Sequence, residues 1–342
     1  MKYNAIGQSQ SDSDQRHPAD LLKTISLDQI NFMKKLVFVL LLCPLFVIAQ
    51  DKLTEANYRI YSVKAGKEIA LNDIVSDMSA ADVLFFGEEH NDSVTHFLEK
   101  SMLELLYAKY GAQTTLSMEM FDRDVQPVMN EYLKGFIREK HFVKDARVWS
   151  NYRDYKPMVE LAKDKGLDVI CANAPTRYTN LAGRKGEDEL AKLPEESQEY
   201  FAPLPYDAAS GDYYEKLTGL PQHAIGSLTD TSKKAAPMSM PGMGNFDLVL
   251  AQSLWDATMA YSIAQYMKKH KGQKVMQVNG RFHSDEGFAV ATQLKHYRPK
   301  VKELIISSGS DEAFPNIKWD DYKKNGDYII VTDPKVPRTY KE

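Results

Sequence analysis

Short apolar runs alternate with longer amphipathic segments from about residue 82 to the C-terminal end of the chain. The short runs have the length of buried strands, and the longer segments repeat their apolar residues at intervals of three and four. This alternation is typical of a parallel sheet covered by helices. The pattern therefore predicts an α/β fold with a mostly parallel central sheet flanked by helices.

The apolar runs and the amphipathic segments can be placed along the chain. Strands are predicted at residues 83–86, 115–120, 167–171, 274–278 and 301–307, with residues 328–331 as a further candidate. A long helix is predicted from Asp247, a favourable N-cap residue, to about Lys269, with Gly272 closing it. Further helices are predicted at residues 93–110, 124–140, 156–165 and 285–295.

One stretch, residues 194–245, breaks the alternation and is rich in Pro, Gly, Ser, Tyr and Met. A long loop inside a compact domain is more often functional or disordered than structural. We expect a largely helical and loop insertion that could cover a pocket.

The N-terminal part carries a different signal. Lys34 and Lys35 precede an apolar run at residues 36–48, which is followed by Ala49. A basic segment, a short apolar stretch and a small residue predict a secretory signal peptide cleaved near Ala49, and the run is too short to span a bilayer. The alternative is a buried strand or helix of the folded domain. Because 32 unpatterned residues come before the signal, we expect translation to start at Met33.

These signals divide the chain into an upstream extension (1–32), a signal peptide (33–49), an N-terminal lead-in (50–67), the α/β domain (68–335, with the insertion 194–245) and a tail (336–342). The expected location is outside the cytoplasm, in the periplasm or associated with the outer membrane. The formal net charge is only −4. Nothing in this charge attracts the whole protein to nucleic acid, which is not expected as a partner.

Polar residues follow the predicted strands at the edge where open α/β sheets bind ligands. The first strand ends in Gly87-Glu88-Glu89-His90 and the fourth leads into Gly280-Arg281-Phe282-His283, while the second contains Glu119. A glycine directly after a strand lets the backbone turn sharply and a ligand approach it closely, and the histidine three residues on can then reach into the crevice. Two imidazoles with carboxylates from Glu88, Glu89 or Glu119 suit a divalent cation or an acid/base pair for hydrolysis. A single histidine after a strand is more often a structural residue, and it is the occurrence of several such polar strand ends together that favours a site.

Aromatic and thioether side chains give weaker signals. Trp149, Tyr152 and Tyr155 could stack on a flat ligand or pack in the core. Met238, Met240 and Met243 could contact a cofactor, although adaptable packing is the more common role of methionine. Trp255 and Met259 on the long helix are expected in the core.

Several of these motifs occur together in the order seen in a known family. They are Gly87-Glu88-Glu89-His90 with His96 behind it, Glu119-Met120, Trp149-x-x-Tyr152-x-x-Tyr155, Asn173-Ala174-Pro175, Ala251-Gln252-x-Leu254-Trp255-Asp256-x-Thr258-Met259-Ala260 and Gly280-x-x-His283. Over residues 68–335 the chain thus resembles the ChaN-like haem-binding proteins, which share a superfamily with Tiki, TraB and erythromycin-esterase-type proteins.

The resemblance implies two functions. ChaN-like proteins are exported or outer-membrane-attached, act in haem or iron uptake and can hold haem between subunits. Tiki-type members are metal-dependent proteases, and the esterases hydrolyse macrolide lactones. Carried over by motif, His90, Glu119 and His283 would bind a divalent metal, and the same three with Glu88 and Glu89 would be the catalytic set of a hydrolase.

For haem, the ligand remains open among Tyr206, Tyr213, Tyr214, His223 and the three methionines of the insertion, because ferric haem accepts His, Met or a tyrosinate oxygen. The residues expected to contact the cofactor are His90, His96, Tyr152, Tyr155, Arg177, Tyr213, Tyr214, Met240 and His283. The chain departs from the family pattern in its individual insertion and in Cys43, which follows Leu42 and not the small residue of a lipidation signal.

The function expected from this resemblance is an exported binding protein for haem or iron-porphyrin that takes part in haem or iron acquisition. Haem is the expected cofactor, and an outer-membrane haem-uptake system and a second copy of the chain are the expected partners. The alternative is a metal-dependent hydrolase of the protease or esterase type, which would make the protein an enzyme.

Overall fold

The computed structural model describes residues 53–219 and 246–340. The predicted upstream extension and signal peptide lie outside the described residues, as do His223, Met238, Met240 and Met243 of the insertion.

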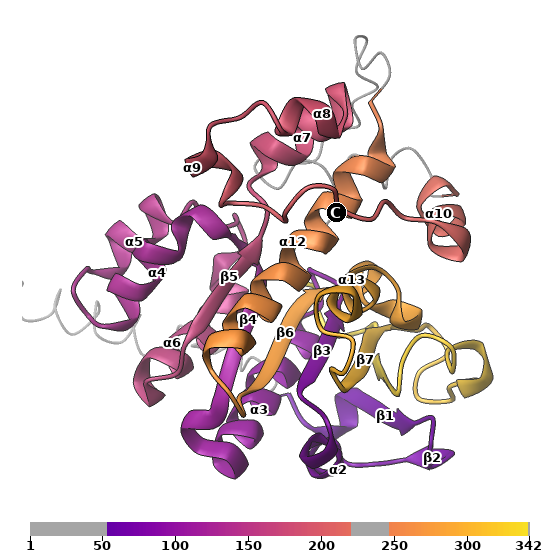
Figure 1. Ribbon diagram of the computed structural model, residues 1–342. Helices are drawn as coiled ribbons and strands as arrows, with labels where there is room; N and C mark the ends of the chain where they lie inside the picture. The colour runs from indigo at the N-terminus through magenta and orange to yellow at the C-terminus, as the bar shows by residue number, and fades with distance from the viewer. Residues whose placement is uncertain (1–52, 220–245, 341–342) are drawn as a thin grey trace, which may run out of the picture. The chain divides into compact units, whose positions relative to one another are not determined.

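A single sheet forms the centre of the described chain (Figure 1). Its strands are β1 (Tyr58–Ser62), β2 (Lys67–Glu68), β3 (Val83–Glu88), β4 (Thr114–Asp122), β5 (Val169–Asn173), β6 (Lys274–Gly280), β7 (Glu303–Ser310) and β8 (Tyr328–Thr332). They lie in the order β2-β1-β8-β7-β3-β6-β4-β5. The pairings among β3 to β8 are parallel, whereas β1 is antiparallel to β8 and β2 to β1. The predicted mostly parallel α/β fold is confirmed.

The six predicted strands are present, and β1 and β2 were not predicted. β1 has the sequence YRIYS, in which polar and apolar residues give no clear period. It is extended because it pairs along its length with β8, from Tyr58 opposite Thr332 to Ser62 opposite Tyr328. The sheet therefore begins inside the segment that was expected to be a lead-in.

Helices connect the parallel strands. They are α2 (Leu71–Asp77), α3 (Ser93–Tyr110), α4 (Gln126–Leu133), α5 (Glu139–Asp145), α6 (Tyr152–Lys165), α7 (Thr176–Lys185), α8 (Glu187–Leu190), α9 (Glu195–Gln198), α10 (Gly211–Thr218), α12 (Leu248–Lys269) and α13 (Ala289–Tyr297). The long predicted helix is α12, and its N-cap Asp247 accepts a hydrogen bond from the Leu250 amide as predicted. Within the described residues, no helix combines the length and the apolar character that crossing a membrane requires.

The prediction of one helix over residues 124–140 was wrong, because two short helices, α4 and α5, occupy this stretch. Gly135 lies between them with a φ of +75°. A residue in the left-handed region cannot continue a right-handed helix, and glycine adopts this region without strain. Similarly, Gly287 with a φ of +73° delays the start of α13 to Ala289.

Alternate side chains of each central strand pack on opposite faces of the sheet. Leu84 and Phe86 of β3 belong to the core on the side of α3 and α6, whereas Val83 and Phe85 belong to the core on the side of α12 and α13. In Figure 1, α12 and α13 lie on the near side of the sheet. Trp255 and Met259 of α12 are buried, as predicted.

The order of the strands brings the candidate site together. β6 lies between β3 and β4, so the C-terminal ends of all three are neighbours. Glu88 at the end of β3 is opposite Gly280 at the end of β6. Ligands of open parallel sheets bind at this edge, and the two Gly-x-x-His motifs leave the sheet there side by side.

Candidate functional site

His90 follows β3 and is held by a carboxylate. Its Nδ1 donates a hydrogen bond to Glu88 Oε1 at 2.7 Å, and the Tyr155 hydroxyl donates to the same oxygen at 2.7 Å. The ring also meets Trp149 edge-on, with 5.2 Å between ring centroids. Because Nδ1 is engaged, Nε2 is the ring nitrogen of His90 that can act on another group.

His283 is held in the same way from the other side. It lies in a 3-10 turn (Arg281–His283) after β6, and its Nδ1 donates to Asp256 Oδ1 at 2.6 Å. Asp256 belongs to α12 and accepts a second hydrogen bond from the Tyr213 hydroxyl of α10, also at 2.6 Å. All three side chains are buried. The Nε2 atom of His283 is thereby directed away from Asp256.

Glu119 of β4 lies between the two imidazoles. Its Oε1 is 3.7 Å from His283 Nε2, and its Oε2 accepts a hydrogen bond from the Gly280 amide at 2.7 Å. His90 Nε2 packs so closely on Gly280 that a Cβ added there would lie 2.8 Å from it. The glycine is therefore required for the approach of His90. We name His90, Glu119 and His283, with their partners Glu88 and Asp256, the two-histidine cluster.

The carboxylates set the protonation of both histidines. Burial disfavours the charged form of His283, but the charges of Glu119 and Asp256 outweigh burial and raise its pKa to about 9. Burial likewise opposes the charge on His90, but its hydrogen bond to Glu88 and the charges of Glu88 and Glu119 raise its pKa above the ordinary value. His283 is therefore protonated at neutral pH, and the neighbouring carboxylates favour the charged form of His90.

The cluster is mostly shielded from solvent. The side chains of His283 and Glu119 are buried, whereas that of His90 is 28% exposed. A ligand from solution therefore reaches the cluster at His90. The cluster combines two imidazoles with a nearby carboxylate, and a further carboxylate orients each imidazole. Such a set can donate and accept protons at a bound group or activate water.

Other residues predicted for this site lie elsewhere. Glu89 points away from the two-histidine cluster, because its carboxylate pairs with Arg338 at 2.8 Å and with Arg281 at 3.8 Å. Arg177, on α7, forms an ion pair with Asp124, with 2.7 Å between Nη1 and Oδ2. Tyr152 packs among Phe121 and Phe142 in the core. His96 is buried behind Glu88, where it cannot reach a ligand at the surface.

The three tyrosines proposed as haem ligands in the insertion differ in how far their side chains are exposed to solvent. The hydroxyl of Tyr206 donates to the Leu250 carbonyl and that of Tyr213 to Asp256, and both side chains are buried. Burial and the charge of Asp256 raise the pKa of Tyr213 well above its usual range, which disfavours a tyrosinate. Tyr214, the next residue on α10, is 48% exposed. Of these three tyrosines, Tyr214 is the one that an incoming ligand can contact.

Sequence reasoning missed three residues of this region. Asp256 was noticed only as part of a motif, because its partner is far away in sequence. Arg338, in the predicted tail, bonds to Glu89 and also to Asn91 at 3.1 Å. Glu99 lies one helical turn after His96 on α3 and bonds to it. The His96-x-x-Glu99 spacing was the one signal in the sequence that could have identified Glu99, because residues three apart share a helix face.

The chain is similar in sequence to a known protein family. Residues 74–294 match the family described as "Haem-binding uptake, Tiki superfamily, ChaN". No functionally curated protein is significantly similar to the chain in sequence.

The fold is shared with a solved structure. The structure of ChaN of Campylobacter jejuni, described for its cofacial haem binding, has a TM-score of 0.59 and 15% identity, and the match covers 82% of this chain and 100% of that one. Two other structures have lower TM-scores. The type III effector HopBA1 has a TM-score of 0.37 and 11% identity, and the match covers 77% of this chain and 94% of that one. The toxin effector domain RRSP from Vibrio vulnificus has a TM-score of 0.38 and 12% identity, and the match covers 80% of this chain and 41% of that one.

Proposed function

The chain belongs to the family of haem-binding uptake proteins described as ChaN in the Tiki superfamily, and on this basis we propose that it binds haem and takes part in haem or iron acquisition. The family match over residues 74–294 carries the proposal. The fold shared with the whole of Campylobacter jejuni ChaN is consistent with it. Haem supplies the iron to be acquired. The residues of this chain supply a ligand to that iron and a surface that contacts the porphyrin.

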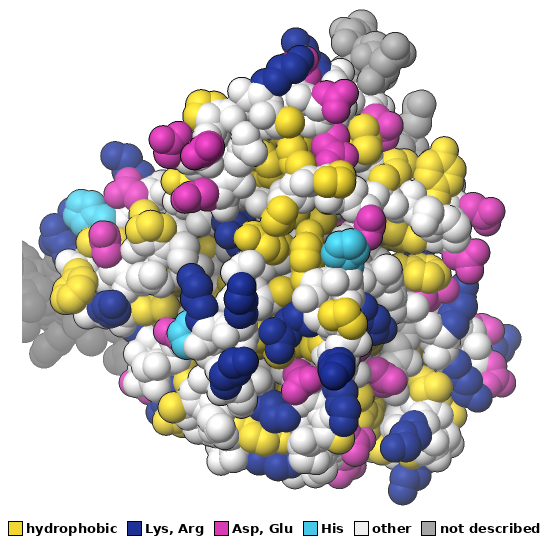
Figure 2. Space-filling view, in the orientation of Figure 1, with side chains coloured by type: hydrophobic (Ala, Val, Ile, Leu, Met, Phe, Trp, Pro, Cys, Tyr) yellow, Lys and Arg dark blue, Asp and Glu magenta, His cyan; other side chains and the backbone are white. Residues whose placement is uncertain are grey.

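The residues around α10 fit such a ligand. Ferric haem accepts a tyrosinate oxygen, and Tyr214 presents its side chain to solvent. Beside it, an apolar cluster of Tyr213, Leu217 and Ala289 is bordered by the half-buried Phe282 and Phe288. Figure 2 shows hydrophobic side chains reaching the surface in the region of α10. We therefore propose Tyr214 as the iron ligand and the half-buried Phe282 and Phe288 as the apolar surface that the porphyrin contacts.

Hemin titration tests the proposal. The wild-type protein is expected to shift the Soret band at stoichiometric hemin, and Tyr214→Phe is expected to lose at least about tenfold in affinity, because phenylalanine offers no oxygen to iron. Tyr213→Phe is the matched control: it makes the same change on the adjacent, buried residue and should bind hemin like the wild type. The absence of a Soret shift in the wild type would refute haem binding. Equal affinity in Tyr214→Phe would refute only the ligand assignment.

We propose a second copy of the chain as the partner in this binding, supported by the cofacial haem described for Campylobacter jejuni ChaN. Two stacked porphyrins need a ligand from each side, and an exposed tyrosine on each copy would supply it. An outer-membrane haem-uptake system is the proposed donor or recipient of the haem.

We also propose that the protein is exported, with cleavage near Ala49, on the strength of the basic, apolar and small residues of the predicted signal peptide. The mature protein isolated from its native cell envelope should therefore begin at about Gln50. N-terminal sequencing checks this, and an intact residue 33–49 segment in the folded protein would contradict it.

The two-histidine cluster favours hydrolysis as a second candidate function. Each imidazole is oriented by its own carboxylate, and their Nε2 atoms flank Glu119. In such a hydrolase Glu119 would position water, while one histidine accepts a proton and the other donates one to the leaving group. Hydrolysis of an ester or peptide by the wild type, and its loss in Glu119→Gln, would support this candidate.

A further inference from the structure

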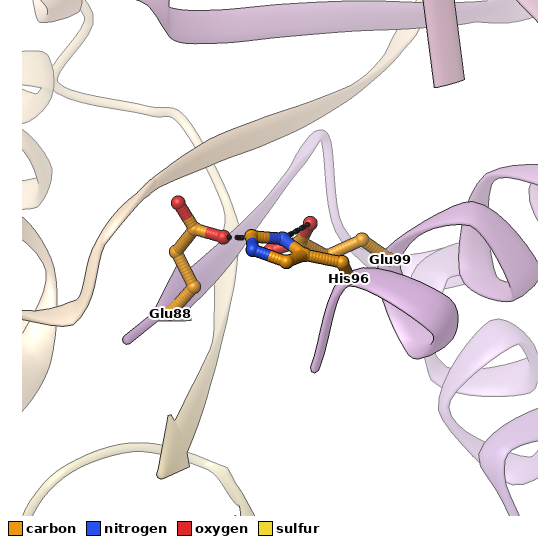
Figure 3. Close-up of side chains that lie close together, drawn as sticks. All are labelled: Glu88, His96 and Glu99. Atoms are coloured by element: carbon orange, nitrogen blue, oxygen red, sulfur yellow. Dashed lines mark hydrogen bonds and ion pairs between the residues drawn. The ribbon is translucent and has the colours of Figure 1, made fainter. Parts of the chain in front are cut away.

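Behind the two-histidine cluster, a second group of titratable side chains is fully enclosed. Glu88 comes from the end of β3, and His96 and Glu99 come from one face of α3 (Figure 3). His96 Nδ1 lies 3.1 Å from Glu88 Oε2 and 3.2 Å from Glu99 Oε2. Figure 3 shows the imidazole lying between the two carboxylates. We name these three residues the buried triad.

The two carboxylates of the buried triad are not fully satisfied by hydrogen bonds, although Glu88 Oε2 faces His96 Nδ1 in an ion pair. Within the described chain, Glu88 Oε2 and Glu99 Oε1 are inaccessible to solvent and make no hydrogen bond. Both carboxylate side chains are entirely buried. Orphaned carboxylate oxygens in the interior are costly unless something compensates them. These under-satisfied carboxylates, which both face His96 Nδ1, point to a ligand bound by the three side chains.

The distances suit a metal ion. Bonds of about 2.0–2.2 Å from zinc to oxygen and nitrogen place tetrahedral ligand atoms about 3.3–3.6 Å apart, slightly farther than the separations observed in the triad before any ion is bound. The two distances from His96 Nδ1 are close to the lower end of this range, and in the described part of the chain no other group of three or more His, Cys, Asp or Glu residues brings its ligand atoms within 4.8 Å of one another. The set expected from the sequence, His90, Glu119 and His283, does not meet this criterion.

The surroundings of His96 match a metal ligand as well. Its other ring nitrogen, Nε2, donates a hydrogen bond to the His90 carbonyl at 3.1 Å. A histidine that coordinates a metal usually donates its second N–H to a carbonyl or carboxylate, which fixes its tautomer and leaves the other nitrogen free for the ion. Nδ1, the nitrogen facing both carboxylates, is the one left for coordination.

We propose that Glu88, His96 and Glu99 bind a divalent transition-metal ion. A dication neutralises the two carboxylates around a neutral imidazole, so the enclosed group carries no net charge. One nitrogen and two or more oxygens suit Zn²⁺, Mn²⁺, Fe²⁺ or Co²⁺ better than Mg²⁺ or Ca²⁺, which prefer oxygen alone. Because the site is closed to solvent, its role is to join α3 to β3 and to hold Glu88, whose other oxygen orients His90.

Metal content tests the proposal. The full chain, stripped with a chelator and dialysed against Zn²⁺ or Mn²⁺, is expected to retain one ion per chain. Glu99→Gln removes a ligand at constant volume and should weaken retention by at least about 100-fold, since even residues behind the ligands change metal affinity 10–100-fold. Glu119→Gln is the matched control, a buried glutamate of the two-histidine cluster, and should retain the ion. Loss in Glu119→Gln with retention in Glu99→Gln would overturn the proposal.

A crystal of the wild-type protein loaded with Co²⁺ locates the ion without relying on any variant. An anomalous peak bounded by Glu88, His96 and Glu99 is expected. A peak between His90, Glu119 and His283, or the retention of no ion by the wild type, would overturn the assignment, and His96 would then be an imidazolium paired with the two carboxylates. Hemin titration of the same samples reports separately on haem binding.

Discussion

Replacing Asp256 with alanine is expected to lower the free energy of unfolding by about 3–5 kcal/mol, the usual cost of removing one partner of a buried ion pair. The carboxylate is enclosed, and both of its oxygens are used, one by His283 and one by Tyr213. Its removal leaves an imidazolium and a hydroxyl in the interior without an acceptor. Urea denaturation of the wild type and the variant measures the difference.

Two control variants provide reference values for the loss of unfolding free energy expected in Asp256→Ala. Tyr213→Phe removes one of the two hydrogen bonds and leaves the ion pair, so it should cost about 1–3 kcal/mol. Asp320→Ala removes an exposed carboxylate paired with Lys323 and should change stability by less than about 0.5 kcal/mol. If Asp256→Ala were as stable as Asp320→Ala, Asp256 could not be the acceptor that the structure assigns. Under the hydrolase candidate, Asp256→Asn should also lower activity, because His283 would lose its orienting charge.

The stabilising contribution of His283 is expected to depend on pH. Its pKa is about 9 in the folded protein and about 6.5 in an unfolded chain. A group whose pKa is raised by folding contributes its full stability below the unfolded pKa and loses it as the pH rises through the folded pKa. The expected contribution is therefore complete below about pH 6.5, declines toward pH 9 and above, and amounts to about 3 kcal/mol.

Denaturant titrations between pH 6 and 10 on the wild type and His283→Gln isolate this contribution, because the other titrating groups are common to both proteins and largely cancel. The stability difference between the two should shrink by about 3 kcal/mol over this range. His141→Gln, at an exposed position, should run parallel to the wild type. A constant difference between the wild type and His283→Gln would show that His283 is uncharged in the folded protein.

The strands that carry the site were predictable because of where they lie. β3, β4 and β6 are covered on both faces, so each has a run of mainly apolar residues that contrasts with the polar segments around it. β1 was missed because it lies next to the edge strand β2 and is extended through pairing with β8, a contact that no local pattern encodes. The end of the helix inside residues 124–140 is signalled in the sequence by Gly135, which takes a positive φ in the structure.

The sequence by itself determined the α/β class, the main strands and helices, the family resemblance and the two Gly-x-x-His motifs at strand ends. These features depend on local periodicity and on residues close together in the chain. Only the tertiary structure decided that β6 lies between β3 and β4, which brings Glu119 between His90 and His283. It also gave His283 its partner on α12, turned Glu89 toward Arg338 and enclosed His96 with Glu88 and Glu99. Which carboxylate faces which imidazole depends on strand order and helix packing between residues far apart in sequence, and spacing along the chain does not carry that information.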